Sequence, residues 1–261
     1  VVAGATGVFA TSEGDINVAV GSVTGATRGI VASNQRATGS LAVLNGRVVI
    51  DASGPVTGET SYGIIGINNG LLADNTLTIR TAGPVTSTSG SAISAQTIGG
   101  NIDITAQGSI LSNAGPTWFG DGIYAEASGT GAVSVLATGA SISGYDGIYT
   151  ATRATSGIGI DVQTTGVVSG LTQFGLYGRA LGASVNLASQ GTATGVLGGL
   201  VATTSGGSGN VTVSTANADS ANGMGVSATI TNAGTGLVRV NVTGASTVSG
   251  VTGVLATTDG S

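Results

Sequence analysis

A short phrase recurs ten times along the 261-residue chain: glycine, an aliphatic residue, a variable residue and a small residue. Successive copies are separated by about 27 residues on average, a spacing typical of solenoid proteins. In such proteins each unit packs only on its neighbours, so no single central core is needed. Alanine replaces the glycine in one copy. The copies begin at Gly7, Gly29, Gly63, Ala92, Gly122, Gly147, Gly175, Gly199, Gly225 and Gly253.

Each period contains a second segment in which apolar and polar residues alternate. In one example, Leu77 and Ile79 flank Thr78, and a period of two places the aliphatic pair on one face of a strand. The density of β-branched residues and glycine argues against helices. A short third strand follows. Together these features predict an all-β fold, a right-handed parallel β-helix of about ten three-stranded coils with a period of about 27 residues.

Equivalent positions should stack in columns about 4.8 Å apart. The aliphatic residues of the phrase are then expected to form one interior ladder. A second column lies after the alternating strand and contains glycine, or asparagine once, which indicates turns with positive φ. Its members are Gly54, Gly83, Gly108, Gly139, Gly166, Gly191, Asn217 and Gly244.

Residues 1–261 are expected to form a single β-helix segment of a longer repeat protein. The longest step between copies runs from Gly29 to Gly63 and contains Asn45-Gly46 between two apolar runs. This dipeptide is a strong hairpin signal and predicts a hairpin excursion at 41–50. An extended coil or a longer loop is the alternative.

Composition excludes several kinds of function. Only 7% of the residues are charged, the net charge is −5, and the chain contains no His, Cys or Lys. Nucleic-acid binding would require a basic patch, and membrane insertion of this segment would require about 20 consecutive apolar residues. Without His or Cys there is no Ser-His-Asp or Cys-His catalytic arrangement. We therefore expect no cofactor and no enzymatic activity.

Several phrases resemble those of a known family. They are G-I-Y-A at Gly122, G-I-Y-T at Gly147 and the run V-S-V-L-A-T-G-A-S-I-S-G from Val133. With the Gly/Ala/Thr/Val bias, they resemble the passenger domains of bacterial type V autotransporters, over essentially the whole chain. This resemblance implies display outside the cell by an outer-membrane translocator. Such passengers act mostly as adhesins, spacers or biofilm and autoaggregation factors, and a minority carry protease or esterase sites.

Two carboxylates occupy equivalent positions in successive copies. Asp121 precedes Gly122 and Asp146 precedes Gly147, so stacking could bring them within about 5 Å of each other. Such a pair could serve a retaining glycosidase or form a weak metal (cation) site. The alternative is that both are solvated turn residues, since 12 acidic residues over ten coils will give some adjacent pair by chance.

Three tyrosines follow the phrase pattern in consecutive copies. Tyr124, Tyr149 and Tyr177 occupy the variable, outward position and predict an exposed aromatic ladder suited to glycan or protein contact. Trp118 and Phe119 precede it closely and could extend the patch. The alternative is that stacking only stabilises the coil, or that a loop or a neighbouring subunit covers the stripe.

These features favour an extracellular, non-enzymatic, structural and adhesive β-helical stalk on a bacterial cell surface. Its expected partners are further copies of itself, or a host or surface glycan or protein. One alternative is a structural subunit of an extracellular filament or surface layer, because scarce charge leaves strand edges little protected. The third is a β-helical polysaccharide hydrolase or lyase that uses Asp121 and Asp146.

Overall fold

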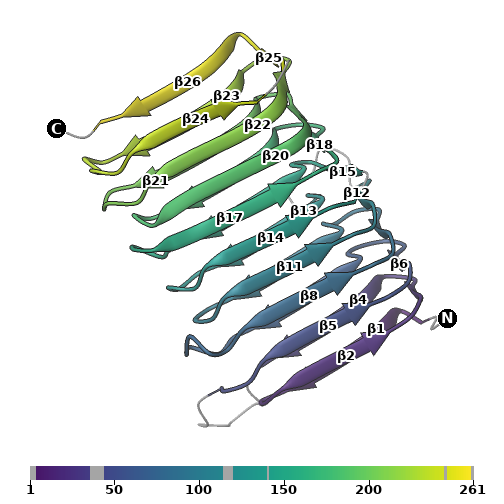
Figure 1. The fold of residues 1–261 in the computed structure, drawn as a ribbon. Helices are drawn as coiled ribbons and strands as arrows, with labels where there is room; N and C mark the ends of the chain where they lie inside the picture. The colour runs from purple at the N-terminus through teal and green to yellow at the C-terminus, as the bar shows by residue number, and fades with distance from the viewer. Residues whose placement is uncertain (1–3, 36–43, 114–119, 140, 244–245, 260–261) are drawn as a thin grey trace.

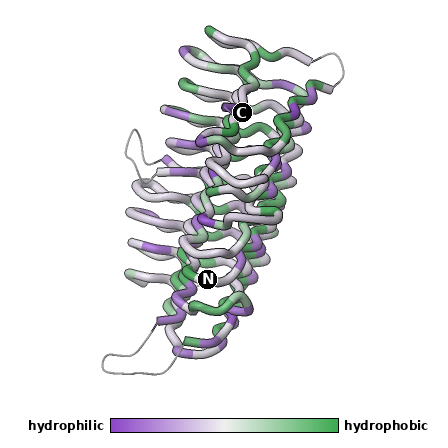
Figure 2. The backbone as a smooth tube through the Cα atoms, turned by 90° about the vertical axis from the view of Figure 1, so that its left-hand side faces the viewer, coloured by the Kyte–Doolittle hydropathy of each residue, from purple (hydrophilic) through white to green (hydrophobic). Residues whose placement is uncertain are grey.

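The chain folds as a parallel β-solenoid. The computed structural model describes residues 4–35, 44–113, 120–139, 141–243 and 246–259. Successive coils stack along one axis, with β1 and β26 at opposite ends (Figure 1). Seen from the side, the coils form one elongated stack (Figure 2). The described residues contain strands and no helix, so the predicted all-β parallel fold is confirmed. The right-handed sense of the coil stays a prediction.

Each copy of the phrase forms one strand of a ten-stranded sheet. Neighbouring strands pair in parallel, with equivalent phrase residues opposite each other, as Ile123 opposite Ile148. The strands in order are β1 (Thr6–Ser12), β4 (Arg28–Asn34), β7 (Ile64–Asn68), β10 (Ile93–Thr97), β13 (Ile123–Ala127), β16 (Ile148–Thr152), β19 (Phe174–Ala180), β21 (Gly198–Ser205), β23 (Met224–Thr231) and β26 (Thr252–Thr258).

The alternating segments form the second strand of each coil, and their inward residues are buried as predicted, for example Leu77 and Ile79. These strands are β2 (Ile16–Val20), β5 (Val48–Ala52), β8 (Leu77–Thr81), β11 (Ile102–Ala106), β14 (Val133–Ala137), β17 (Ile158–Thr164), β20 (Ser184–Gly195), β22 (Val211–Ser220) and β24 (Val238–Val242). The separate third strands are β3 (Val23–Gly25), β6 (Val56–Gly58), β9 (Val85–Ser87), β12 (Ile110–Ser112), β15 (Ser141–Gly144), β18 (Val167–Gly170) and β25 (Val248–Ser249).

The number of complete three-stranded coils is somewhat below the expected ten. Seven coils have three separate strands, as the bounds above show. In two others the second and third strands merge into the single long strands β20 and β22, and β20 pairs with both β17 and β18. Within the described residues, which end at Asp259, no second or third strand follows β26, the last strand of the first sheet. The difference is therefore one of strand continuity and does not change the architecture.

The aliphatic residues of the phrase form the predicted interior ladder. Its central members are fully buried: Ile30, Ile64, Ile93, Ile123, Ile148, Leu176, Leu200 and Val226. The end members differ, since Val8 is partly buried and Val254 is exposed. Both belong to the terminal strands of the sheet, which have a neighbouring strand on one side only.

Close packing favours the glycine that opens the phrase, although one copy has the slightly larger Ala92 there. A Cβ atom on Gly147 would lie 2.5 Å from Cγ1 of Val168 and 2.6 Å from the carbonyl oxygen of Gly175. The Gly175 oxygen is a backbone atom of the next coil, so it cannot withdraw without moving that strand.

We therefore expect Gly147→Ala to lower the free energy of unfolding by about 1–3 kcal/mol, the usual cost of overpacking. Gly21→Ala is the matched control, because no atom lies within 4 Å of the added Cβ at that position. Urea denaturation compares the two. Equal stability of both variants would contradict the packing explanation.

The predicted positive φ in the glycine turn column is wrong for its described members. Positive φ occurs instead in turns between first and second strands, for example at Gly157 and Gly182. The column contains glycine because its members stack directly on one another: a Cβ on Gly108 would lie 2.2 Å from the carbonyl oxygen of Gly83. Close approach of backbone, rather than conformation, selects glycine here.

A polar column inside the coil escaped the sequence analysis. It ends the strands of the first sheet and bonds turns between first and second strands, in the same coil or in the preceding one. Asn68 Nδ2 donates to the carbonyl oxygen of Gly46 (2.9 Å), and Thr97 Oγ1 donates to that of Gly100 (2.6 Å). Both residues are at most 3% exposed. The side chains thus satisfy turn carbonyl groups that lie away from solvent.

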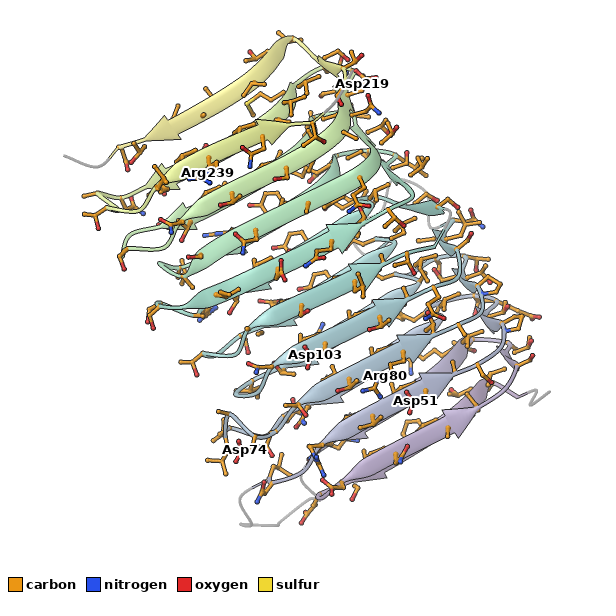
Figure 3. All side chains as sticks on the ribbon, in the orientation of Figure 1. Asp51, Asp74, Arg80, Asp103, Asp219 and Arg239 are labelled. Carbon is orange, nitrogen blue, oxygen red and sulfur yellow. The ribbon has the colours of Figure 1, made fainter. Side chains whose placement is uncertain are left out.

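The hairpin expected at 41–50 lies partly outside the described residues, which resume at Leu44. Of the segment that follows, Val48 and Ile50 are fully buried and belong to β5, which pairs in parallel with β2 and β8. The second half of the segment therefore belongs to the coil, because its aliphatic residues continue the interior columns. On the outer face of the same strand, Asp51 pairs with Arg80 of β8 at 3.2 Å (Figure 3).

Candidate functional site

The three outward tyrosines form a stacked ladder on one flank of the solenoid. Tyr124 lies opposite Tyr149, and Tyr149 lies opposite Tyr177, on the adjacent strands β13, β16 and β19. The ring centroids are 5.2 Å apart in both pairs, with interplanar angles of 6° and 19°. The predicted stacking is confirmed, and all three side chains are half-buried. Trp118 and Phe119 lie outside the described residues, so their contribution stays a prediction.

The ladder continues beyond Tyr177 through a residue that the sequence analysis did not single out. The ring of Phe174 stacks on Tyr177 with centroids 5.1 Å apart. At the other end, the hydroxyl of Tyr124 donates a hydrogen bond to the carboxylate of Glu126. Burial raises the pKa of Tyr149 to about 12, and burial together with Glu126 raises the pKa of Tyr124 further. The phenols are therefore neutral hydrogen-bonding groups at physiological pH.

Asp121 and Asp146 lie beside this ladder, and each is only 4% exposed. The Oδ1 atom of Asp121 accepts a hydrogen bond from the backbone N–H of Asp146 (3.1 Å), and Oδ1 of Asp146 accepts one from the N–H of Phe174 (2.8 Å). Each carboxylate thus bonds the backbone of the next coil. The alternative of solvated turn residues is wrong, because the side chains turn toward the neighbouring coil rather than toward water.

Burial shifts the acidity of both groups. The pKa of Asp121 rises to about 7, chiefly because burial disfavours the charged form, and the hydrogen bond from Asp146 only partly offsets this. The negative charge of Asp146 raises it further. The pKa of Asp146 rises to about 6, again through burial, opposed by the N–H of Phe174. Near neutral pH, protonated and ionised forms of the pair therefore coexist.

Tyr124, Tyr149 and the two carboxylates line one cavity of about 560 Å³, and Tyr177 is not among its lining residues. Four of the five tyrosines of the chain contribute to it, which is a strong concentration in a protein with 3% aromatic residues. Two of the three predicted ladder tyrosines and both predicted carboxylates thus meet in one place. The lining residues are Tyr62, Ser91, Ser94, Gln96, Asp121, Tyr124, Tyr145, Asp146, Tyr149 and Gln173.

Four further residues of this cavity were not predicted from the sequence: Tyr62, Tyr145, Gln96 and Gln173. Tyr62 lies one residue before a phrase glycine, in the same column as Asp121 and Asp146. Following that column along all ten copies would have found it. Tyr145 is 8% exposed and accepts a hydrogen bond from Nε2 of Gln173 (2.7 Å). These contacts depend on the turn before the phrase, whose shape the repeat does not specify.

The cavity offers aromatic surface, two carboxylates, two amides and hydroxyl groups. Only one oxygen of each carboxylate has a hydrogen-bond partner in the described structure, so the second oxygen is available to a ligand. No group of three or more His, Cys, Asp or Glu side chains that could hold a metal ion occurs among the described residues. Asp121 and Asp146 alone would supply two carboxylate ligands, fewer than the six to eight oxygens that calcium takes.

The fold defines the chain as a parallel β-solenoid protein. It matches no protein-family model, no curated protein and no solved structure. Within the described residues, no helix is long and apolar enough to cross a membrane. The likeness to autotransporter passengers accordingly rests on the repeat phrases and on composition.

Proposed function

We propose that this protein is an extracellular, structural and adhesive β-helical stalk, displayed on a bacterial cell surface and without enzymatic activity. The observation that carries the proposal is the gathering of four tyrosines and two carboxylates in one cleft on the flank of a repetitive rod. A stacked coil provides length and rigidity, and aromatic side chains around a cleft are suited to binding a partner.

The proposal of a non-enzymatic role is supported by the bonding of the carboxylates. A retaining glycosidase needs one carboxylate as nucleophile and one as acid, whereas Asp121 and Asp146 each bond a backbone N–H of the next coil. The chain also lacks His, Cys and Lys. Hydrolysis of any polysaccharide in a broad panel, lost in both Asp121→Asn and Asp146→Asn, would establish the hydrolase or lyase instead.

Display on the surface is proposed from the resemblance to type V passengers. The partner of the cleft is proposed to be a glycan or protein of a host or neighbouring cell, or another copy of the chain. Neither nucleic acid nor direct membrane insertion fits the composition, with its net charge of −5 and 7% charged residues.

Adhesion tests the proposal directly. Cells that display the protein with Tyr124, Tyr149 and Tyr177 all replaced by serine should adhere or aggregate at least about tenfold less, since aromatic side chains dominate many interfaces. Phe9→Ser is the control: Phe9 belongs to the same outward column, is 65% exposed and lies outside the cleft. Circular dichroism confirms that the variants fold. Unchanged adhesion of the folded triple variant would contradict the proposal.

A subunit of a filament or surface layer is the second candidate. Several large apolar side chains on the outside of the coil favour it, including Ile158 (62% exposed) and Leu171 (58% exposed). Exposed apolar surface of this kind can mediate lateral association. Electron microscopy and analytical ultracentrifugation distinguish the two: ordered polymers favour the subunit, and separate rods favour the stalk.

A further inference from the structure

The tyrosine ladder ends abruptly at a small residue. In the same outward column, Ser94 of β10 lies between Tyr124 of β13 and Ile65 of β7. One face of the Tyr124 ring is covered by Tyr149, while on the other side the preceding coil supplies only the hydroxymethyl group of Ser94. The face of Tyr124 that is turned toward Ser94 therefore lacks a stacking partner in its own column.

The neighbouring column is also small in the same coil. Ser91 occupies the position that Asp121 and Asp146 hold in the following coils and that Tyr62 holds in the preceding one. Serine thus replaces a larger residue twice on one coil, and Ser91, Ser94, Tyr62 and Tyr124 all line the cavity. The cleft is a place where one coil of the solenoid omits its large side chains.

The thickness of this slot follows from the coil spacing. Ile65 and Tyr124 are two coil steps apart, which corresponds to about 9.6 Å. The existing ladder places rings 5.2 Å apart. The slot therefore accommodates one ring-thick layer, a guest that continues the stack where the chain supplies no ring.

The rim of the slot selects against negative charge. Among the described residues that line it are Asp121 and Asp146 and no basic side chain. Each carboxylate keeps one oxygen without a hydrogen-bond partner in the described structure, and the exposed Gln96 offers both an amide donor and a carbonyl acceptor. Such acceptors bind hydroxyl groups, and a plain aromatic ring would leave the buried carboxylate oxygens unpaired. An acidic sugar would meet like charges.

We propose that the slot beside Ser94 binds one neutral hexopyranose residue of a glycan, with the apolar face of the sugar ring stacked on Tyr124. Its hydroxyl groups donate to the second oxygen of Asp121 and bond the amide of Gln96. The aliphatic C–H groups of the sugar carry partial positive charge and meet the negative face of the tyrosine ring. This inference rests on the proposed adhesive function of the flank and names the ligand class of that site.

Filling the slot tests the inference. Ser94→Tyr adds the missing ring to the ladder and should occupy the space of the sugar while preserving the fold. Ser227→Tyr is the matched control, because Ser227 lies in the same outward column on β23, between Val201 and Leu255 and away from the cleft. Gln96→Ala is a milder variant at an exposed position, so it probes the rim without changing the packing.

The probes are neutral gluco-, galacto- and manno-configured oligosaccharides on an array, beside sialylated and sulfated ones, followed by calorimetry. The native protein should bind at least one neutral glycan and none of the acidic ones. Ser94→Tyr should weaken that binding at least about tenfold, as expected for loss of a central contact, and Gln96→Ala should weaken it less. Ser227→Tyr should bind like the native protein.

Binding to no neutral glycan, equal binding of acidic glycans, or undiminished binding by folded Ser94→Tyr would overturn the inference. Failure of the proposed adhesive function can be distinguished from failure of the sugar slot. If Ser94→Tyr loses glycan binding while cell adhesion is unchanged in both Ser94→Tyr and the triple tyrosine variant, the sugar slot stands and the adhesive role of the flank falls. If adhesion depends on the three ladder tyrosines but Ser94→Tyr binds neutral glycans as the native protein does, the adhesive role stands and the sugar slot falls.

Discussion

Truncating Ile123 or Ile148 to alanine is expected to lower the free energy of unfolding by about 2–5 kcal/mol each. Both side chains are fully buried and lie opposite each other in the interior ladder. The backbone of the two coils is held by strand pairing on both sides, so the surroundings can collapse only partly around the cavity. Urea denaturation followed by circular dichroism measures the loss.

Two comparisons isolate the cause. Ile148→Val removes a single methyl group and should cost about 0.5–1.5 kcal/mol. Leu136→Ala truncates a side chain of similar size that points outward and is 41% exposed, so it should cost much less than Ile148→Ala. Because Ile123 and Ile148 are neighbours, the double variant should deviate from additivity. A cost at Ile148 no larger than at Leu136 would contradict the interior ladder.

The second large effect is a loss of stability as pH rises from about 4 to about 7. The pKa of Asp121 is raised from 3.8 to about 7 in the folded protein, so the folded chain binds more protons than the unfolded chain between these values. The contribution of Asp121 is fully present below about pH 4 and is lost as pH rises through its folded pKa. At roughly 1.4 kcal/mol per pKa unit, the loss amounts to about 4 kcal/mol. Asp146 changes stability in the same direction.

Asp121→Asn should remove most of this dependence. The amide oxygen can still accept the hydrogen bond from the backbone of Asp146, but no buried charge forms. The variant should therefore be more stable than the native protein at pH 8 and about equally stable at pH 4. Asp103→Asn, at an exposed position on β11, controls for the loss of one acidic group. Parallel stability profiles of native protein and Asp121→Asn would show that Asp121 is not buried as described.

Periodicity alone was sufficient to predict which residues stack. Because the side-chain period of a strand is two and each coil repeats the phrase, Ile123 had to lie over Ile148 and Tyr124 over Tyr149 once the coil was assumed. The interior ladder and the aromatic ladder could therefore be read from residue positions, and the structure has both.

The features that were not predicted depend on how deeply side chains are buried and on the shape of the turns between strands. The repeat specifies which coil a residue belongs to. It does not specify how deeply the turn before the phrase is buried, so Asp121 and Asp146 were not recognised as buried. The glycines at positions 83 and 108 were predicted to have positive φ. They are instead selected by contact between the backbones of adjacent coils. The cleft arises because Ser91 and Ser94 are small at positions where the neighbouring coils have larger side chains. A small side chain forms no recognisable motif, so the cleft was not predicted.

Stacking of like positions on successive coils is most directly tested by distances between spin labels on one outward column. Asn17, Asp103 and Arg239 are exposed members of that column, the last two marked in Figure 3. The chain contains no Cys, so engineered cysteines at these positions label specifically. Successive strand partners place three coil steps between Asn17 and Asp103, and five between Asp103 and Arg239.

Double electron–electron resonance on the three pairwise variants should give distances of about 14, 24 and 38 Å, because each step adds about 4.8 Å. The longest distance should equal the sum of the other two, as it does for three points on one line. Distances that do not follow the number of coil steps, or an Asn17–Arg239 separation much shorter than that sum, would contradict the stacked coil.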